Sequence, residues 1–221
     1  MNQFKPIADR VERELSCSAH SMDHILRVYN LCSCLADSEE GVDREVLLVS
    51  ALLHDIARAR EDSDETRSIR HEIQGSRMAA EILEELGYSA GFIGKVRHCI
   101  ETHRYRSGNT PLTIEAKILF DADKLDAIGA VGIARSFMLA GQFGEMLYQD
   151  VPLEEFRKEN TLEKDIIKDM SRHSPNLEYE LKLKKIPQRL FTVKAMELAR
   201  ERIEFMESFF RLLGEEIKGL R

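Results

Sequence analysis

The sequence has no tryptophan, only five prolines among its 221 residues, and no long apolar run. Without a stretch of about 18 apolar residues, and without the apolar region of a signal peptide at its start, we expect a cytoplasmic protein with no membrane partner. The four cysteines form no CxxC motif and no paired framework, so we expect reduced thiols rather than disulfides. These cysteines are Cys17, Cys32, Cys34 and Cys99.

The chain also lacks an excess of positive charge. It has 32 Lys and Arg against 39 Asp and Glu, which gives a formal net charge of −7. A nucleic-acid backbone or an anionic membrane needs clustered Lys and Arg, so we expect no stable nucleic-acid binding. A small phosphorylated ligand is still compatible with a locally basic pocket. Four arginines form such a local cluster: Arg58, Arg60, Arg67 and Arg70. They either belong to a solvated loop or contact the phosphate of a ligand.

Helical periodicity dominates the chain, and no convincing strand alternation interrupts it, so the sequence predicts an all-α protein. Asp43 and Ser89 are placed as N-caps, and Gly87 as a helix stop. A polar loop is expected over 60–66, a glycine-punctuated segment of small residues over 129–144, and a polar, less ordered helical excursion from about 150 to 185. The expected helices cover about 6–17, 22–37, 43–58, 70–86, 90–103, a long segment from 113, and 188–213.

The most apolar run in the sequence, residues 46–57, contains a histidine and an aspartate side by side. Only Ser50, His54 and Asp55 have polar side chains in this run, so an imidazole and a carboxylate must enter the interior. A buried carboxylate without a partner would be neutralised or would cost several kcal/mol. A divalent cation supplies that partner and also explains the adjacent histidine.

Two more candidate ligands lie on other predicted helices. His24 is in the first turn of the helix at 22–37, and Asp123 lies in the apolar run 116–126. Together with His54 and Asp55 they can converge inside a helical bundle. Two imidazoles and two carboxylates suit Mn, Fe, Ni, Zn or Mg rather than a soft thiolate metal. Four protein ligands on an octahedral ion leave positions for water and substrate, which is typical of a catalytic site.

These residues resemble the H…HD…D signature of the HD-domain superfamily of metal-dependent phosphohydrolases. His24 stands first, His54-Asp55 lies in Leu-Leu-His-Asp-Ile-Ala, and Asp123 lies in Asp-Ala-Asp-Lys-Leu-Asp-Ala. The run 121–135 is similar to small bacterial and archaeal HD hydrolases, some of which act on nucleotides. The resemblance implies one HD domain over 1–221, with a metal-binding core over about 18–140 and a C-terminal helical extension over about 150–221.

The same resemblance implies hydrolysis of a phosphoester or phosphoanhydride bond by metal-activated water. The family's last ligand follows alanine in an Ala-Asp-x-Leu string, which selects Asp123 over Asp121 and Asp126. Those two carboxylates then orient a ligand or relay a proton, unless they are surface residues. The residues expected to act in catalysis are Asp55, Asp126 and Lys124. The residues expected to contact substrate are Arg58, Arg70, Lys124 and His103.

Some HD nucleotidases carry a glutamate three residues after the motif aspartate, and this chain has Arg58 there. That role is therefore vacant or belongs to another carboxylate such as Asp126. His71 and His98 occupy the order and rough spacing of extra ligands in two-metal members of the superfamily. They would hold a second ion with Asp55 as a bridge, or they bind phosphate or lie at the surface. The histidines not expected as ligands are His20, His103 and His173.

Three functions are compatible with this pattern. The first, favoured by the four-ligand signature and the nearby Arg and Lys, is a phosphohydrolase that acts on a nucleotide or another small phosphorylated metabolite. The second is a di-iron oxygenase, since HD proteins with six ligands also include such enzymes. The third is a nucleotide-sensing module without turnover. Residues 150–221 would either close over the site or join a homodimer interface.

Overall fold

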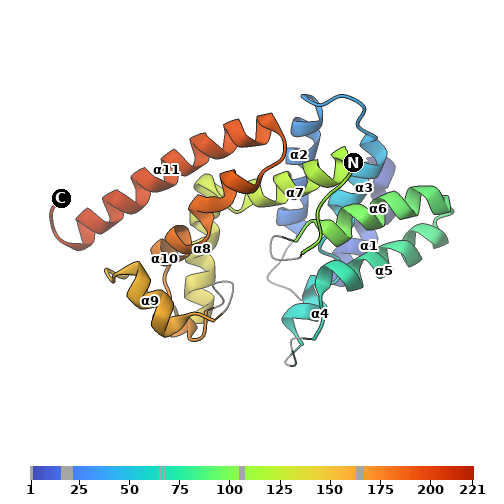
Figure 1. Ribbon diagram of the computed structural model, residues 1–221. Helices are drawn as coiled ribbons and strands as arrows, with labels where there is room; N and C mark the ends of the chain where they lie inside the picture. Colours follow the sequence, from blue (N-terminus) through green and yellow to red (C-terminus); the bar gives the residue numbers. More distant parts are fainter. Residues whose placement is uncertain (1, 16–21, 65, 67, 105–107, 163–166) are drawn as a thin grey trace. The chain divides into compact units, whose positions relative to one another are not determined.

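The computed structural model describes residues 2–15, 22–64, 66, 68–104, 108–162 and 167–221. Within these ranges the chain is helical and has no strand, and the pair Thr161 and Ile167 forms an isolated β-bridge. The predicted all-α fold class is therefore confirmed (Figure 1). The chain divides into two compact units, Met1–Asp123 and Lys124–Arg221. Each unit is described below by itself.

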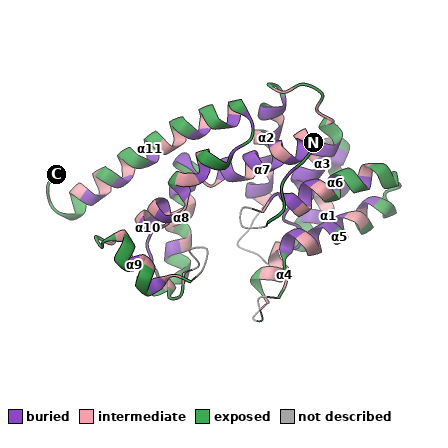
Figure 2. Ribbon diagram, viewed as in Figure 1, coloured by how far each residue is buried: buried purple, intermediate pink, exposed green. Residues whose placement is uncertain are grey.

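The first unit is built around α3. This helix packs against α1, α2 and α6, while α5 and α6 lie side by side (Figure 1). Most of α3 is buried, as the apolar run 46–57 predicts, and Figure 2 shows its residues largely in the colour for buried positions. The elements are η1 (Asn2–Phe4), α1 (Lys5–Leu15), α2 (Met22–Ala36), α3 (Arg44–Leu53), α4 (Arg58–Asp62), α5 (His71–Glu85), α6 (Ala90–Thr102) and α7 (Ile114–Asp126), whose last turn extends into the second unit.

Several helix ends follow the local signals in the sequence. Asp43 caps α3 by accepting a hydrogen bond from the Val46 N–H at 3.2 Å, and Ser89 caps α6 by accepting one from the Phe92 N–H at 3.3 Å. Gly87 follows the end of α5 with φ of 80°, in the left-handed region that favours glycine. The predicted caps and the predicted stop are confirmed.

The predicted helix over 43–58 is wrong at its C-terminal end. α3 stops at Leu53, residues 54–57 form a turn, and the short helix α4 begins at Arg58, inside the region predicted in part as a loop. Two hydrogen bonds of the tight i→i−3 type, from Ile56 N to Leu53 O at 3.1 Å and from Arg58 N to Asp55 O at 2.8 Å, close this turn. Neighbouring residues of a continuous α-helix face different directions, so the turn frees the side chains at 54 and 55 to face one centre.

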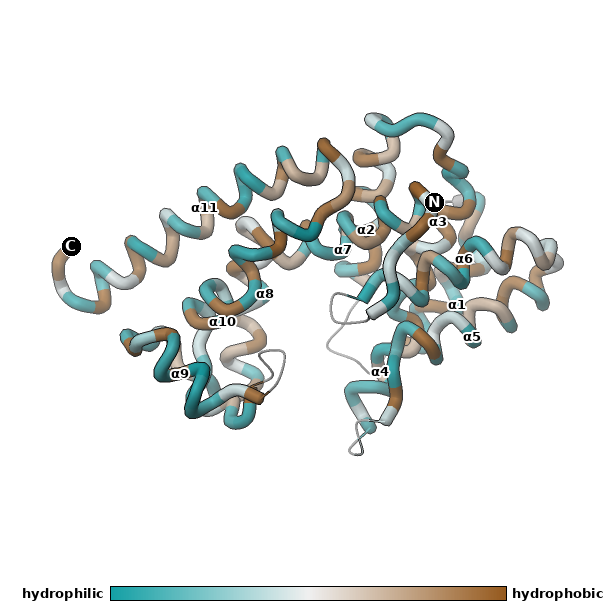
Figure 3. The backbone as a smooth tube through the Cα atoms, viewed as in Figure 1, coloured by the Kyte–Doolittle hydropathy of each residue, from teal (hydrophilic) through white to brown (hydrophobic). Residues whose placement is uncertain are grey.

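The second unit contains α8 (Gly129–Phe143), α9 (Leu153–Asn160), η3 (Met170–Arg172), α10 (Pro175–Leu181), η4 (Leu183–Arg189) and α11 (Val193–Ile217). α8 packs against α10 and α11, and α10 also contacts α9 and η4. Figure 3 shows apolar and polar positions alternating along α11, as expected for a helix with one packed face. The region 150–185, predicted as a helical excursion, contains α9 and α10.

Two glycines of α8 are required by close neighbours. Gly129 has φ of 81°, and a Cβ atom there would lie 2.9 Å from Cγ of Arg202. A Cβ atom at Gly132 would lie 2.3 Å from the carbonyl oxygen of Ala127, whereas Gly141 has open space around it. A side chain therefore has no room at Gly129 and Gly132, whereas Gly141 could carry one.

The described cysteines Cys32, Cys34 and Cys99 are free thiols, and burial raises the pKa of Cys99 to about 12. None of the helices in the described ranges has the length and apolar character needed to cross a membrane. The predictions for Cys17, His20 and Arg67 lie outside the described residues.

Candidate metal centre

Six side chains from distant parts of the first unit converge on one buried point. Five of them are less than a tenth exposed, and the sixth, Asp123, is half-buried. They come from α2, from the turn after α3, from the two facing ends of α5 and α6, and from α7. The residues are His24, His54, Asp55, His71, His103 and Asp123.

Asp55 lies at the centre of this cluster. Its Oδ2 atom is 3.6 Å from His24 Nε2 and 3.7 Å from His54 Nε2. Its Oδ1 atom is 3.4 Å from His71 Nε2 and 3.4 Å from His103 Nε2. Each carboxylate oxygen therefore faces its own pair of imidazoles, so Asp55 can serve two neighbouring sites at once.

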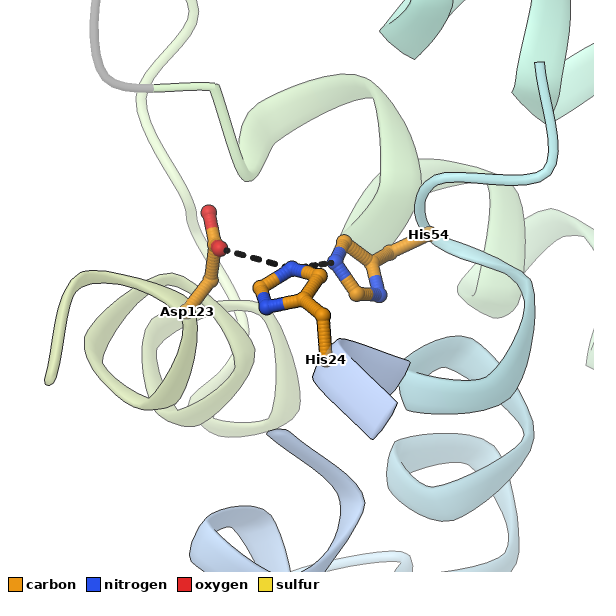
Figure 4. Close-up of side chains that lie close together, drawn as sticks. All are labelled: His24, His54 and Asp123. Carbon is orange, nitrogen blue, oxygen red and sulfur yellow. Dashed lines mark hydrogen bonds and ion pairs between the residues drawn. The ribbon is translucent and has the colours of Figure 1, made fainter. Parts of the chain in front are cut away.

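Figure 4 shows the first of these two sides, where His24, His54 and Asp123 point toward one another from separate elements. His24 Nε2 lies 3.3 Å from His54 Nε2 and 3.5 Å from Asp123 Oδ1. The ligand atoms of these three residues all lie within 4.8 Å of one another, and so do those of His54, Asp55 and His103. Both groups are compact enough to hold a metal ion.

Hydrogen bonds on the outer side of the rings decide which nitrogen carries the proton. The Nδ1 atoms of His54 and His103 each donate to the carbonyl oxygen three residues earlier, at 2.9 and 2.6 Å. His71 Nδ1 donates to Glu61 at 2.7 Å. A neutral imidazole has a single N–H, so the Nε2 atoms of these three rings present bare lone pairs to the cluster. Histidines that ligate metals in proteins are oriented in this way.

The donor set fits a divalent cation. The Nε2 atoms of His71 and His103 lie 3.2 Å apart, and the Nδ1 atom of each ring faces an oxygen acceptor, so a neutral form of each ring presents its Nε2 lone pair to the other. Two facing lone pairs repel each other, and a cation that both can bind removes the conflict. Imidazole nitrogens together with carboxylate oxygens suit Mn, Fe, Ni or Zn.

The protonation states of the central pair also suit metal binding. Burial lowers the pKa of His54 to about 4, and the neighbouring His103 and His24 act in the same direction. Asp55 and Asp123 act to raise this pKa but do not outweigh burial. The His54 ring is therefore neutral at pH 7. Burial alone would raise the pKa of Asp55, but the surrounding imidazoles, with His54 first, hold it well below its usual range. A neutral imidazole and an ionised carboxylate are the ligand forms of these side chains.

Glu61 supports the cluster from the side of His71. Besides accepting the His71 proton, its carboxylate lies 3.2 Å from Arg58 Nη1 and 3.0 Å from Arg104 Nη1. Burial acts to raise the pKa of Glu61, but the hydrogen bond from His71 and the two guanidinium groups outweigh it and lower the pKa to about 2. Glu61 is therefore ionised, and it fixes His71 with Nε2 toward Asp55.

The predicted substrate contacts have different environments. Arg58 is half-buried, and its Nη1 atom lies 3.5 Å from His71 Nδ1, at the edge of the cluster. Arg70 is more exposed and donates two hydrogen bonds to the fully buried Glu72, at 2.9 and 2.7 Å. Lys124 and Asp126 are buried in the last turn of α7 and belong to the second compact unit, so their roles stay predictions. Burial of Asp121 and Asp126 removes the interpretation of either as a surface carboxylate.

The structure brings the four predicted ligands together, but it does not bring His98 to them. His98 Nε2 accepts a hydrogen bond from the Leu112 N–H at 3.1 Å, and His103 takes the position expected for it. The two histidines are five residues apart, so on a helix they point about 140° away from each other. His103 follows the end of α6 as His54 follows the end of α3, with the same bond to the carbonyl three residues earlier. The expected helix over 90–103 included His103, so no local signal in the sequence marked this position.

Comparisons with known proteins agree on one family. The profile of the HD domain matches residues 22–128. YpgQ of Bacillus subtilis is 30% identical over 210 residues, which cover 92% of this chain and 87% of YpgQ. The crystal structure of an HD-superfamily hydrolase from Bacillus thuringiensis gives a TM-score of 0.72 at 26% identity and covers 98% of this chain and 97% of that one. The crystal structure of Bacillus subtilis YpgQ in complex with ADP gives a TM-score of 0.71 at 30% identity. The match covers 98% of this chain and 97% of that one.

Proposed function

The chain belongs to the HD-domain family, and on that premise we propose that it is a metal-dependent phosphohydrolase. Its reaction is the hydrolysis of a phosphoester or phosphoanhydride bond in a nucleotide or another small phosphorylated metabolite. The observation that carries this proposal is the arrangement of four imidazoles around the two oxygens of the Asp55 carboxylate.

The cluster offers two sets of ligands. His24, His54, Asp55 and Asp123 would hold one divalent ion, and His71 and His103 would hold a second one together with Asp55. A divalent ion in such a site lowers the pKa of water from about 15.7 toward 7 and neutralises a phosphoryl oxygen. The imidazole content favours Mn, Fe, Ni or Zn over Mg, which prefers oxygen ligands.

The protein's own groups prepare the site before substrate arrives. Nδ1 hydrogen bonds hold three rings with their lone pairs toward Asp55, so little reorganisation is needed on binding. Arg58 keeps a positive charge at the edge of the cluster. Burial acts to lower the pKa of its guanidinium group, but the carboxylates of Asp55, Asp62 and Glu61 outweigh burial and raise this pKa. A guanidinium beside the ligands can bind a phosphate oxygen, so Arg58 is the proposed phosphate contact.

A nucleotide is the substrate class that we favour. The YpgQ structure with ADP, at 30% identity over nearly the whole chain, supports a nucleoside phosphate as ligand. Arg70 and Lys124 stay proposed contacts, and Asp126 stays the proposed proton relay. The six-residue donor set also fits two irons, so a di-iron oxygenase is the second candidate, and a nucleotide sensor without turnover is the third.

The decisive experiment is a hydrolysis screen on the purified chain after removal and replacement of metal. Nucleoside mono-, di- and triphosphates are incubated with Mn²⁺, Fe²⁺, Ni²⁺, Zn²⁺ or Mg²⁺, and released phosphate and pyrophosphate are measured. We expect turnover of at least one nucleotide, its loss in Asp55→Asn, and no change in Asp37→Asn, which alters an exposed carboxylate paired with Arg44.

Two other outcomes would overturn the proposal in favour of the alternatives. Two irons per chain with oxygen-dependent turnover, and no phosphate release, would identify an oxygenase. Tight nucleotide binding by the metal-loaded protein without any product would identify a sensor.

A further inference from the structure

The two proposed histidine ligands of the second ion are each followed by a charged residue, and these two charged residues pair with each other. Glu72 follows His71 at the start of α5, and Arg104 follows His103 just after the end of α6. The two helices lie side by side. Arg104 Nη1 donates a hydrogen bond to Glu72 Oε2 at 2.9 Å. An ion pair therefore joins the same two helix ends that carry the ligands.

Glu72 is fully buried, although it lies on the wrong side of His71 to bind the second ion. Its Oε2 atom is 3.8 Å from His71 Nδ1, whereas the atom of that ring that faces Asp55 is Nε2. A buried carboxylate costs free energy unless hydrogen bonds and opposite charges compensate it. Arg70 donates two hydrogen bonds to Oε1, at 2.9 and 2.7 Å, and Arg104 donates one to Oε2. Glu72 is therefore buried as the partner of these guanidinium groups rather than as a ligand.

Arg104 also contacts the carboxylate that orients His71. Its Nη1 atom lies 3.0 Å from Glu61 Oε1, and the other oxygen of Glu61 lies 2.7 Å from His71 Nδ1. A terminal nitrogen of arginine carries two N–H groups, so one nitrogen can serve both carboxylates. Because His103 directly precedes Arg104 in the chain, this side chain links the backbone of one ligand to two carboxylates beside the other ligand.

A further ion between the carboxylates is the alternative explanation of this cluster. The ligand atoms of Glu61, His71 and Glu72 all lie within 4.8 Å of one another, which is compact enough for a metal. However, Arg104 contacts both carboxylates and Arg70 contacts one of them, so an ion placed there would meet two positive charges at close range. The carboxylates are therefore the partners of the arginines, and the ion pair has to be explained by what it holds in place.

The spacing of the two histidines decides whether they can share an ion. Imidazole nitrogens lie about 2.1 Å from a bound zinc, so two nitrogens on one ion are separated by roughly 3.0 Å at an octahedral angle and roughly 3.4 Å at a tetrahedral one. The distance of 3.2 Å between His71 Nε2 and His103 Nε2 falls between these values. A shift of about 1 Å at either helix end would be enough to lose this fit.

We propose that Glu72 and Arg104 are positioning residues whose ion pair holds His71 and His103 at the spacing that the second ion requires. The ligands of the first ion come from α2, from the turn after α3 and from α7, which this pair does not join. Loss of the pair should therefore weaken the second ion selectively. The inference rests on the two-ion centre of the proposed function, but it does not require that the protein hydrolyses a nucleotide.

The test measures how many Mn²⁺ ions bind per chain, and with what affinities, by equilibrium dialysis of the full-length protein followed by metal analysis. We expect two ions for the unmodified protein. His103→Ala, which lacks a ligand of the second ion, identifies the affinity of the first one. No substrate is present, so the result does not depend on hydrolysis.

Two variants each remove one partner of the pair. Glu72→Gln keeps the shape of the side chain without its charge, and Arg104→Met keeps most of the length without the guanidinium group. Each should weaken the second ion about 10- to 100-fold and leave the affinity of the first ion unchanged. The double variant should be no weaker than the more affected single variant, because both changes break the same contact. Both single variants should fold, since Glu72 keeps Arg70 and Arg104 keeps Glu61.

The same substitutions elsewhere on the two helices are the controls. Glu85→Gln on α5 removes an exposed carboxylate paired with Arg10, and Arg97→Met on α6 removes an exposed guanidinium group paired with Glu101. Both controls should bind two ions as tightly as the unmodified protein does. Thermal unfolding in chelator shows that each variant is folded.

Three results would overturn the inference. The first is a single ion per chain in the unmodified protein. The second is full affinity for the second ion in both single variants. The third is equal weakening of both ions, which would mean that the pair stabilises the whole unit rather than the second ligand pair. Two bound ions with the expected variant effects, but no hydrolysis of any nucleotide, would instead refute the proposed hydrolase and leave this inference standing.

Discussion

Replacement of His103 with alanine should remove much of the stabilisation that a divalent ion gives to this protein, whereas replacement of His98 should not. His103 Nε2 faces both His71 Nε2, at 3.2 Å, and Asp55 Oδ1, at 3.4 Å. A divalent cation bound between these three atoms would use the His103 nitrogen as a ligand. His98 instead accepts the Leu112 N–H at 3.1 Å, away from the cluster.

The magnitude follows from binding linkage. An ion present at about 100 times its Kd stabilises the folded state by about 2.7 kcal/mol. Loss of even a residue that only supports a ligand lowers metal affinity by about 10- to 100-fold. If His103→Ala costs about 100-fold, the remaining stabilisation at the same ion concentration is about 0.4 kcal/mol. For a chain of this size the difference corresponds to a Tm change of about 5 to 9 °C.

The assay is thermal unfolding of each protein in chelator and in Mn²⁺, Zn²⁺ or Ni²⁺, followed by circular dichroism. His98→Ala loses one hydrogen bond, about 1 kcal/mol, equally with and without metal, so its metal-induced shift should match that of the unmodified protein. A full metal-induced shift in His103→Ala, or its loss in His98→Ala, would refute the assignment of the second ligand pair.

Other predictions test the surroundings of the centre and the packing of the second unit. Glu61→Gln removes the charged acceptor that orients His71 and should lower metal affinity about 10- to 100-fold in a chelator competition, while Glu14→Gln, an exposed partner of Arg60, should leave it unchanged. Gly132→Ala places a Cβ atom 2.3 Å from the Ala127 carbonyl oxygen and should lower the free energy of unfolding, measured in urea, by about 1–3 kcal/mol. Gly141 lies on the same helix in open space, so Gly141→Ala should raise the free energy of unfolding by about 0.5–1 kcal/mol. Asp43→Ala removes the N-cap of α3 and should lower the free energy of unfolding by about 0.5–2 kcal/mol. Equal stability of the variant and the unmodified protein would contradict this prediction.

Features set by local chemistry could be predicted from the sequence. Asp43 and Ser89 cap helices because their side chains reach a backbone N–H three residues later, and Gly87 follows a helix because it tolerates a positive φ. The His54-Asp55 pair was found because polar side chains interrupt a run that has to be buried. Each of these signals lies within a few residues of the feature that it predicts.

Features set by long-range packing could not be predicted in the same way. The apolar pattern continues through Ile56 and Ala57, so nothing local announces that α3 stops at Leu53. The choice between His98 and His103 depends on which face of α6 meets the cluster, and that is decided by its neighbours. Glu61 reaches His71 across ten residues through the α4 turn, which the polar sequence of 60–66 does not reveal.

The most direct test of the central claim is anomalous X-ray diffraction from crystals of this chain soaked with Mn²⁺ and measured near the manganese edge. We expect one anomalous peak bound by His24, His54, Asp55 and Asp123, and a second on the other oxygen of Asp55, bound by His71 and His103. Manganese peaks that all lie beyond coordinating distance of Asp55, or a site built on His98, would contradict it.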